Sequence, residues 1–483
     1  MSVIEFRSPR SRFDDYRLEG EMNFTLGEEE NVVMIGPNGA GKTLIARYIA
    51  GGIAIGEGSI ERRRADGSVM ALNDVMTLEF KDLYRIGGAG QDDYYQKRWH
   101  ATETEGSPLV HQILGPDVIR ANRQLIKDIG VEPILRKRLI NLSSGEQRKL
   151  LIVRSLLKQP EVLIIDNPYI GLDPDSRETV NGLLSEISRQ KGIKMILIVS
   201  HPKDLPEWID TVFAVKGRRL LCKTTRSEFL ANKELIADLF PEMTMESAST
   251  REMPAPKDER VYDVSVRMNN VCITYGQTKI LHKLSWQINR GEKWALLGQN
   301  GSGKSTLLSL VCADNPQAYA NDISLFGKDR GTGETIWQIK KRIGYVSPDM
   351  HAYYKADITC LDVVSSGFFD AVGLYNKPSE EQRALARKWM ETFHCEALAD
   401  KMFLKSSYGE QRLVLLVRAF VKSPSLLILD EPLHGLDAGK KKLAKLLIED
   451  YCRQADVTLV YVTHYHDEIP SVVEHSMNLI KNS

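Results

Sequence analysis

Cysteine is scarce in this sequence, and the few cysteines show no pattern. No two of them form a CxxC pair or another metal-ligand spacing; the six are Cys222, Cys272, Cys312, Cys360, Cys395 and Cys452. A disulfide framework of the kind found in small secreted domains is therefore excluded, and so is a cysteine-bound metal centre. We expect reduced thiols that pack inside a cytosolic protein.

Long apolar runs are also missing. No stretch approaches the roughly 20 apolar residues that a membrane-spanning helix needs. The opening residues, MSVIEFRSPR, lack the apolar core of a secretory signal. We therefore expect a cytoplasmic protein that does not cross a membrane.

An excess of charge of either sign is absent as well. The 64 basic and 64 acidic residues give a formal net charge of zero, so no overall field draws the chain toward nucleic acid. The sequence therefore offers no clear nucleic-acid site. With 42% hydrophobic residues, the 483-residue chain can bury at least two cores.

The same set of short motifs occurs twice. GPNGAGKT returns as GQNGSGKS, LSSGEQR as SSYGEQR, VLIIDNPYIGLD as LLILDEPLHGLD, and IVSH as YVTH. The offset is nearly constant: 304 − 42 = 262 between Lys42 and Lys304, and 430 − 166 = 264 between Asp166 and Asp430. One long offset indicates a duplicated domain and not a solenoid of short repeats.

The junction between the two copies has the composition of a linker. We place the first domain at residues 1–240, the linker at 241–262 and the second domain at 263–483. The segment PEMTMESASTREMPAPKDERVY is rich in proline, serine and charge, and it has no apolar periodicity.

Each copy alternates short apolar runs with helical stretches. Runs such as NVVMIG, EVLIID and KMILIV in the first copy, and KWALLG, SLLILD and TLVYV in the second, suit strands that are buried on both faces. The alternation predicts an α/β fold in which helices cover a mixed, mostly parallel sheet. A polar, helix-prone region at residues 377–401 predicts an additional helical subdomain.

Two glycine-rich motifs fit the phosphate loop G-x-x-x-x-G-K-[ST]. Their glycines let backbone amides curl around phosphate oxygens, and the helix that follows adds its positive end. We expect Lys42 and Lys304 to reach the β- and γ-phosphates of ATP. The predicted nucleotide-binding residues are Gly36, Pro37, Asn38, Gly39, Ala40, Gly41, Lys42 and Thr43, and Gly298, Gln299, Asn300, Gly301, Ser302, Gly303, Lys304, Ser305 and Thr306.

A magnesium ion is the cofactor that accompanies ATP in such loops. Thr43 and Ser305 supply the hydroxyl that binds it. Asp166 and Asp430 end apolar strands and are the expected carboxylates for the same ion, either as direct ligands or in its outer sphere.

The SSGEQR and SYGEQR stretches, taken with these motifs, resemble the ATP-binding cassette superfamily over nearly the whole chain. The resemblance implies two tandem P-loop cassettes that pair within one chain, each ATP lying between one phosphate loop and the other cassette's signature. It implies nucleotide contacts for Ser143, Gly145, Ser407 and Gly409, and D-loop positions for Asp173 and Asp437. Tyr275 looks like the aromatic residue that stacks on adenine. Phe13 stands at the same spacing, with a core position as its alternative.

The two cassettes differ where hydrolysis is expected to occur. By the resemblance, Glu431 positions or accepts the proton of the attacking water, and His464 contacts the γ-phosphate. The first copy has Asn167, whose amide cannot accept that proton, and such a loss typically costs ~10²–10⁴-fold in rate. We expect the site with Glu431 to turn over, and the site with Asn167 and His201 to hold ATP and hydrolyse it slowly. The alternative is a neutral substitution with another base nearby, although DNPYIGL offers no candidate carboxylate for that base beyond Asp166, which is assigned to magnesium.

The signatures diverge in the same direction. Ser143, Ser144 and Gly145 stay close to the family's serine-glycine-glycine run and face the site with Glu431. Between Ser407 and Gly409 the bulky Tyr408 intervenes, facing the site with Asn167. Asn167 and Tyr408 are therefore two departures from the family pattern that fall on the same ATP site. This coincidence favours a site that still binds ATP but hydrolyses it slowly.

The partner is the least defined expectation. Transporter cassettes usually carry a glutamine that contacts the membrane subunit, but Pro348 or Asp349 stands there in the second copy, and the first has none near Lys81. Residues 318–347 resemble the ModF-type group of molybdenum-transport or photorepair proteins. That resemblance implies an ATPase energising transport, with molybdate as cargo, through separate permease subunits at the inner face of the cytoplasmic membrane. The alternatives are a soluble ATPase acting on ribosomes or nucleic acid, and a regulatory nucleotide sensor.

Overall fold

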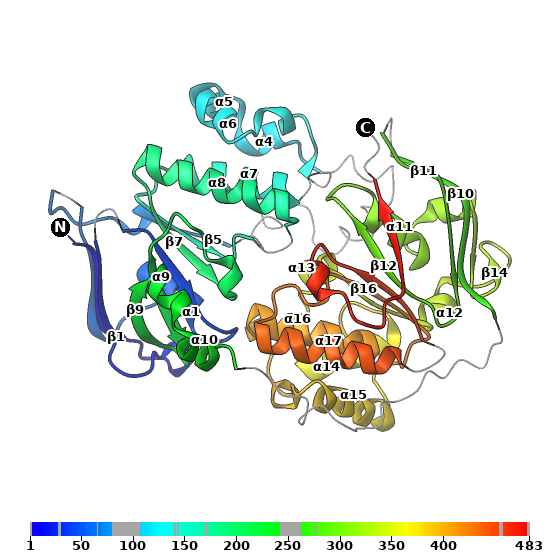
Figure 1. Cartoon of the computed structure of the whole chain (residues 1–483). Coiled ribbons are helices and arrows are strands. Elements are labelled where there is room, and N and C mark those ends of the chain that lie inside the picture. Colours follow the sequence, from blue (N-terminus) through cyan, green and yellow to red (C-terminus); the bar gives the residue numbers. More distant parts are fainter. Residues whose placement is uncertain are drawn as a thin grey trace. The chain divides into compact units, whose positions relative to one another are not determined.

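The computed structural model describes residues 2–27, 30–64, 66–79, 107–139, 142, 144–169, 172–241, 262–275, 278–453 and 457–480. They form two compact units, one built almost wholly from residues before position 243 and the other from residues after it (Figure 1). The boundaries expected at 240 and 263 stay a prediction, because most of the proposed linker lies outside the described residues. Lys81 and Ser143 lie outside them as well.

A six-stranded sheet forms the centre of the first unit. Its order is β5-β6-β7-β3-β8-β9, and all neighbours are parallel except β8 and β9. The strands are β3 (Val32–Ile35), β5 (Val75–Glu79), β6 (Val162–Asp166), β7 (Lys194–Val199), β8 (Thr211–Lys216) and β9 (Arg219–Thr225). The mostly parallel sheet predicted from the apolar runs is confirmed.

Helices and a small antiparallel sheet cover this central sheet. The small sheet has the order β2-β1-β4, with β1 (Ser2–Arg10), β2 (Asn23–Gly27) and β4 (Glu57–Arg62). The α-helices described here are α1 (Lys42–Ile49), α4 (Val110–Leu114), α5 (Pro116–Ala121), α6 (Arg123–Asp128), α7 (Ser144–Leu156), α8 (Pro174–Lys191), α9 (Arg226–Ala231) and α10 (Lys233–Leu239). Short 3-10 turns are η1 (Asp14–Tyr16), η2 (Leu72–Asp74), η6 (Glu132–Ile134) and η8 (Pro202–Asp204).

Successive residues of the central strands enter two different cores. Val33 and Ile35 pack with α7 and α8 on one face. Val32 and Met34 pack with α1 and the small antiparallel sheet on the other. Because a strand's side chains alternate in direction, burial on both faces requires an uninterrupted apolar run, which is what NVVMIG provides.

The second unit repeats this plan with a five-stranded sheet. The order β15-β16-β17-β12-β18 is parallel throughout. Its strands are β12 (Lys293–Gly298), β15 (Ile343–Val346), β16 (Leu426–Asp430), β17 (Thr458–Val462) and β18 (His475–Leu479). An antiparallel sheet of order β11-β10-β13-β14 comprises β10 (Val264–Tyr275), β11 (Thr278–Asn289), β13 (Asp322–Leu325) and β14 (Lys328–Asp329).

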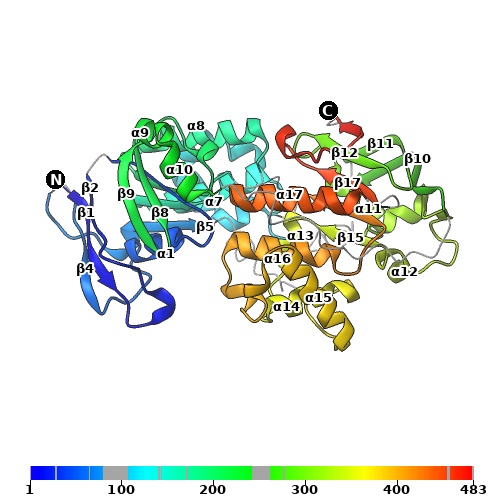
Figure 2. The same ribbon diagram turned by 60° about the horizontal axis from the view of Figure 1, so that its bottom comes forward.

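Helices again divide between the two faces of the sheet, and Figure 2 shows the same elements from a second direction. Leu427 and Leu429 pack against a mainly helical layer, while Leu426 and Ile428 pack toward α11 and the antiparallel sheet. The helices are α11 (Lys304–Val311), α12 (Ile336–Lys340), α13 (Pro348–Tyr353), α14 (Cys360–Ser365), α15 (Glu380–Thr392), α16 (Tyr408–Phe420) and α17 (Ala438–Cys452). The 3-10 turns are η10 (Pro316–Ala320), η11 (Ser366–Phe369), η12 (Glu396–Leu398), η13 (Phe403–Lys405) and η14 (His466–Glu468).

The helical region expected at residues 377–401 is present as α15 and η12, next to α14 and α16. None of the helices in the described part of the chain has the length and apolar character that crossing a bilayer requires.

Candidate active sites

The first phosphate loop joins β3 to α1. Gly41 adopts φ 95° just before the helix, and a Cβ at this position would lie 2.8 Å from Cα of Arg218, so only glycine fits. The buried Lys42 ammonium donates to the carbonyls of Gly36 (2.7 Å) and Pro37 (2.8 Å), which hold it across the loop. The sequence thus folds its glycines and lysine into one turn at the start of a helix.

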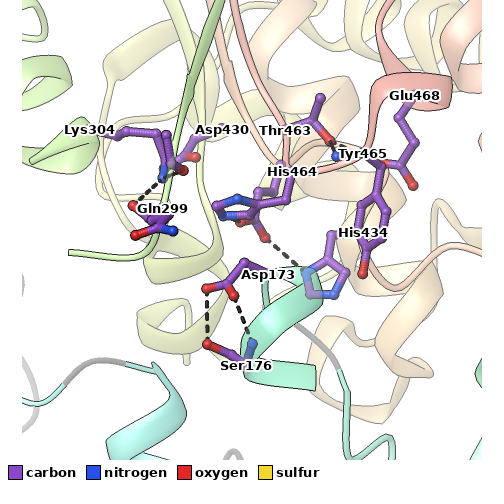
Figure 3. Close-up of polar contacts among 12 residues, drawn as sticks. Asp173, Ser176, Gln299, Lys304, Asp430, His434, Thr463, His464, Tyr465 and Glu468 are labelled. Carbon is purple, nitrogen blue, oxygen red and sulfur yellow. Dashed lines mark hydrogen bonds and ion pairs between the residues drawn. The ribbon is translucent and has the colours of Figure 1, made fainter. Parts of the chain in front are cut away.

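The second phosphate loop, between β12 and α11, has the same form. Gly303 has φ 99°, and Lys304 Nζ donates to the carbonyls of Gly298 (2.6 Å) and Gln299 (3.0 Å), the second of which Figure 3 draws. Asn300 Nδ2 and Ser302 Oγ are buried and make no hydrogen bond within the described residues. A phosphate group in the loop would satisfy such donors.

In the first unit, Thr43 and Asn167 both contact the carboxylate of Asp166. Asp166 ends β6, and its Oδ2 accepts a 2.6 Å hydrogen bond from Thr43 Oγ1. Its other oxygen, Oδ1, accepts from Asn167 Nδ2, also at 2.6 Å. His201 caps the start of η8, and its Nδ1 accepts from the Lys203 backbone N–H at 3.0 Å. Both oxygens of Asp166 therefore have a donor within the unit.

In the second unit, the corresponding pair consists of two neighbouring carboxylates. Asp430 ends β16 and is buried. Burial, and then the charge of Glu431, raises the pKa of Asp430 to about 7. Ser305 follows Lys304 in the first turn of α11, and Thr306 is buried in the same turn.

Glu431 lies between two imidazoles. His464 Nε2 is 3.1 Å from its Oε1, and His434 Nδ1 is 3.2 Å from its Oε2; Figure 3 shows both rings. Burial alone would raise the pKa of Glu431, but hydrogen bonds from the two histidines hold this pKa well below its usual range. The carboxylate is therefore charged near neutral pH. The sequence interpretation named His464 and missed His434, although His434 differs from Ile170 in the aligned motif.

Asn167 and Glu431 occupy the same backbone position in their units. Both have positive φ, 51° and 49°. The backbone N–H of each donates, at 2.9 Å, to the strand that precedes the predicted histidine of its unit. Asn167 donates to Ile198 O on β7, before His201, and Glu431 donates to Val462 O on β17, before His464. The two motifs thus fold alike, and the difference between them is in the side chains.

Buried arginines tie the signature helices to these turns. Arg412 of α16 donates to the carbonyls of Asp430 (3.1 Å) and Glu431 (2.6 Å). Arg148 of α7 donates to the carbonyl of Pro168 at 3.0 Å. The sequence interpretation missed both, although they are the last letter of the repeated GEQR.

The second signature is capped and packed within its own unit. The Ser407 side chain accepts from the Glu410 N–H, and Glu410 accepts from the Ser407 N–H at 2.7 Å. The Tyr408 ring lies 4.4 Å from the ring of His351, centroid to centroid. It also lies so close to Gly435 that a Cβ there would be 2.3 Å from Tyr408 Cε1. In this unit Gly409 is buried; in the first, Gly145 lies in the first turn of α7.

The remaining predicted residues are found at the edges of the elements. Asp173 caps α8 by accepting from the Ser176 N–H at 2.8 Å (Figure 3), and Asp437 is buried just before α17. The Tyr275 hydroxyl accepts from Asn315 Nδ2 at 2.9 Å. Phe13 is 63% exposed, so a core role for it is wrong, while stacking on adenine stays a prediction.

The family of the chain follows from comparison with known proteins. The family model described as ABC transporter matches residues 20–170 and 281–434. The chain belongs to the ABC transporter family. Cassettes of this family are P-loop ATPases, so this is a tandem ABC protein that binds and hydrolyses ATP.

Two relatives match this chain over nearly its whole length and nearly the whole of their own. The ABC transporter ATP-binding protein ModF of Escherichia coli is 33% identical over 490 residues, covering 99% of this chain and 97% of that protein. An uncharacterized ABC transporter ATP-binding protein of Schizosaccharomyces pombe is 28% identical over 498 residues, 99% and 98% of the two chains. Among solved structures, a chain matches from the complex of the archaeal ribosomal stalk protein aP1 and the archaeal ribosome recycling factor aABCE1. The TM-score is 0.51 and the sequence identity 16%, and the match covers 98% of the present chain and 87% of the chain in that structure. At that identity the likeness is one of fold alone.

Proposed function

We propose that the chain binds two ATP molecules between its cassettes and hydrolyses ATP mainly at the site built on Lys304 and Glu431. This hydrolysis energises transport through separate membrane permease subunits, with molybdate as the candidate cargo because the chain resembles the ModF-type group. The protein would then work as a cytoplasmic subunit held peripherally at the inner face of the cytoplasmic membrane.

One observation supports unequal rates of hydrolysis at the two sites: the same turn holds a charged carboxylate in one unit and an amide in the other. Glu431 is mostly buried, with 14% of its side chain exposed, and it is ionised between His434 and His464, the charge state in which a carboxylate can position water or accept its proton. Asn167 instead donates a hydrogen bond from its side-chain amide to Asp166. The Asn167 site keeps its lysine and hydroxyl, so ATP binding survives there while hydrolysis is slow.

The side chains of both sites suit a magnesium ion. Thr43 Oγ1 and Asp166 Oδ2 converge to 2.6 Å, and hydroxyl and carboxylate oxygens are the ligands that Mg²⁺ prefers. Ser305 and Asp430 are the matching residues in the second cassette. When bound with ATP, the ion neutralises charge on the β- and γ-phosphate oxygens.

Two substitutions test the unequal sites. Glu431→Gln should lower kcat for ATP hydrolysis ~10²–10⁴-fold, whereas Asn167→Ala should leave kcat within a few-fold of wild type. Steady-state phosphate release measures both, and retained binding of a fluorescent ATP analogue shows that the variants fold. Equal losses from the two substitutions would contradict a single fast site.

The transport role has its own test. The Glu431→Gln protein, arrested with ATP and Mg²⁺, should sediment with membranes that contain its permease subunits and should be released by ADP. Sedimentation with ribosomes instead would replace the transport proposal with that of a translation-associated ATPase. The Lys304→Ala variant is the control. It lacks the lysine that holds the phosphates at the hydrolysing site, so it should not be trapped in the ATP-bound state.

A further inference from the structure

The turn that follows β16 brings a second histidine onto Glu431. The His434 N–H donates to the Glu431 carbonyl at 3.1 Å and closes the turn. Leu433 and Leu436 on either side are buried, so the turn is anchored in the core. His434, whose side chain is 14% exposed, directs Nδ1 to Glu431 Oε2 at 3.2 Å.

Two donors on two oxygens restrain a carboxylate more than one donor does. His464 Nε2 contacts Oε1, at 3.1 Å, and with that contact alone the carboxylate could still turn about its last side-chain bond. The contact of His434 with Oε2 removes this freedom. A general base acts only when its lone pair is directed at the water it activates, so fixed orientation contributes to rate.

The duplicated motif supplies an independent comparison. In DNPYIGLD the position of His434 is taken by Ile170, whose side chain has no hydrogen-bond donor. The first copy therefore lacks the carboxylate and its second donor together. If His434 served only to close the turn, its loss would have no reason to accompany the loss of Glu431.

We propose that His434 is a positioning residue for ATP hydrolysis, which holds the Oε2 oxygen of Glu431 while His464 holds Oε1. The proposal rests on the proposed function, in which Glu431 positions or deprotonates the attacking water. His434 acts through Glu431 and need not touch ATP.

Substitutions at position 434 separate this role from a structural one. His434→Ile, the residue of the first copy, should lower kcat roughly 10- to 100-fold, the effect of losing one hydrogen bond to a charged group, with KM for ATP unchanged. His434→Asn should recover most of kcat, because its amide nitrogen is as many bonds from Cα as Nδ1. Wild-type kcat in His434→Ile, or an equal loss in His434→Asn, would overturn the proposal.

A double-mutant cycle tests whether His434 acts through Glu431. In the Glu431→Gln background, His434→Ile should lower the residual kcat by less than threefold, since the carboxylate it holds is already gone. A full additional loss there would show that His434 acts elsewhere. If Glu431→Gln itself kept wild-type kcat, the proposed function would fail first, whatever the His434 variants did. Nucleotide binding by each variant, measured with a fluorescent ATP analogue, verifies folding.

Discussion

At the scale of single residues, an asparagine at position 167 avoids two unfavourable features that a glutamate would bring to this turn. Position 167 and position 431 both have φ near 50°, a region that asparagine adopts more readily than glutamate. Glu431 also places its charge beside Asp430 and raises that residue's pKa, whereas Asn167 donates a hydrogen bond to Asp166. In the first unit the amide thus avoids both features, whereas in the second the hydrogen bonds from His434 and His464 stabilise the charged Glu431.

Asn167→Glu should therefore destabilise the first unit. Added backbone strain and a second negative charge next to Asp166 should together lower the free energy of unfolding by about 1–3 kcal/mol. The midpoint of thermal unfolding without nucleotide or Mg²⁺ measures this. Asn167→Gln, which brings the longer side chain to the same φ without the charge, is the matched control and should lower stability less. A more stable Asn167→Glu protein would refute the account.

At the scale of elements, the buried strands and the phosphate loops could be predicted, because both depend on local sequence. The run VLII at residues 162–165 is apolar at every position because each face of β6 is covered, and G-x-x-x-x-G-K fixes its own turn. The antiparallel sheets could not be predicted in this way. β1 pairs with β4 from Arg10 opposite Glu57 to Ile4 opposite Arg62, with a shift in register, and no local pattern specifies such pairing.

Parts of the site were hidden for a similar reason. The contact of His434 with Glu431 depends on a four-residue turn, and that of Arg412 depends on where α16 packs. Aligning the two copies could have singled out His434 against Ile170. No comparison between the copies could single out Arg412, because both keep the arginine.

The start of α16 yields a prediction about the contact between Tyr408 and Gly435. Gly435→Ala should be destabilising by roughly 2–4 kcal/mol, because its Cβ would overlap the Tyr408 ring and because Gly435 has φ 78°. Thermal unfolding of the second unit is the measurement. Tyr408→Ala added to Gly435→Ala should recover the part due to overlap and leave the part due to backbone strain. Simple additivity of the two losses would show that the ring and the glycine are not coupled.

At the scale of the whole molecule, two cassettes in one chain favour pairing within that chain. Covalent linkage gives each cassette a high effective concentration of the other. The Glu431→Gln protein with ATP and Mg²⁺ should therefore show the mass of one chain in light scattering at micromolar concentration. Separately expressed cassettes mixed at the same concentration serve as the comparison and should pair less completely. A stable dimer of full chains would contradict pairing within one chain.

The shared turn at Asn167 and Glu431 also bears on why the two halves differ. A glutamate at position 167 would strain the backbone at φ 51° and place a second charge beside Asp166. With Ile170 where the second copy has His434, that glutamate would also lack the second donor. A single exchange would therefore cost stability and restore little rate, which favours two unequal halves.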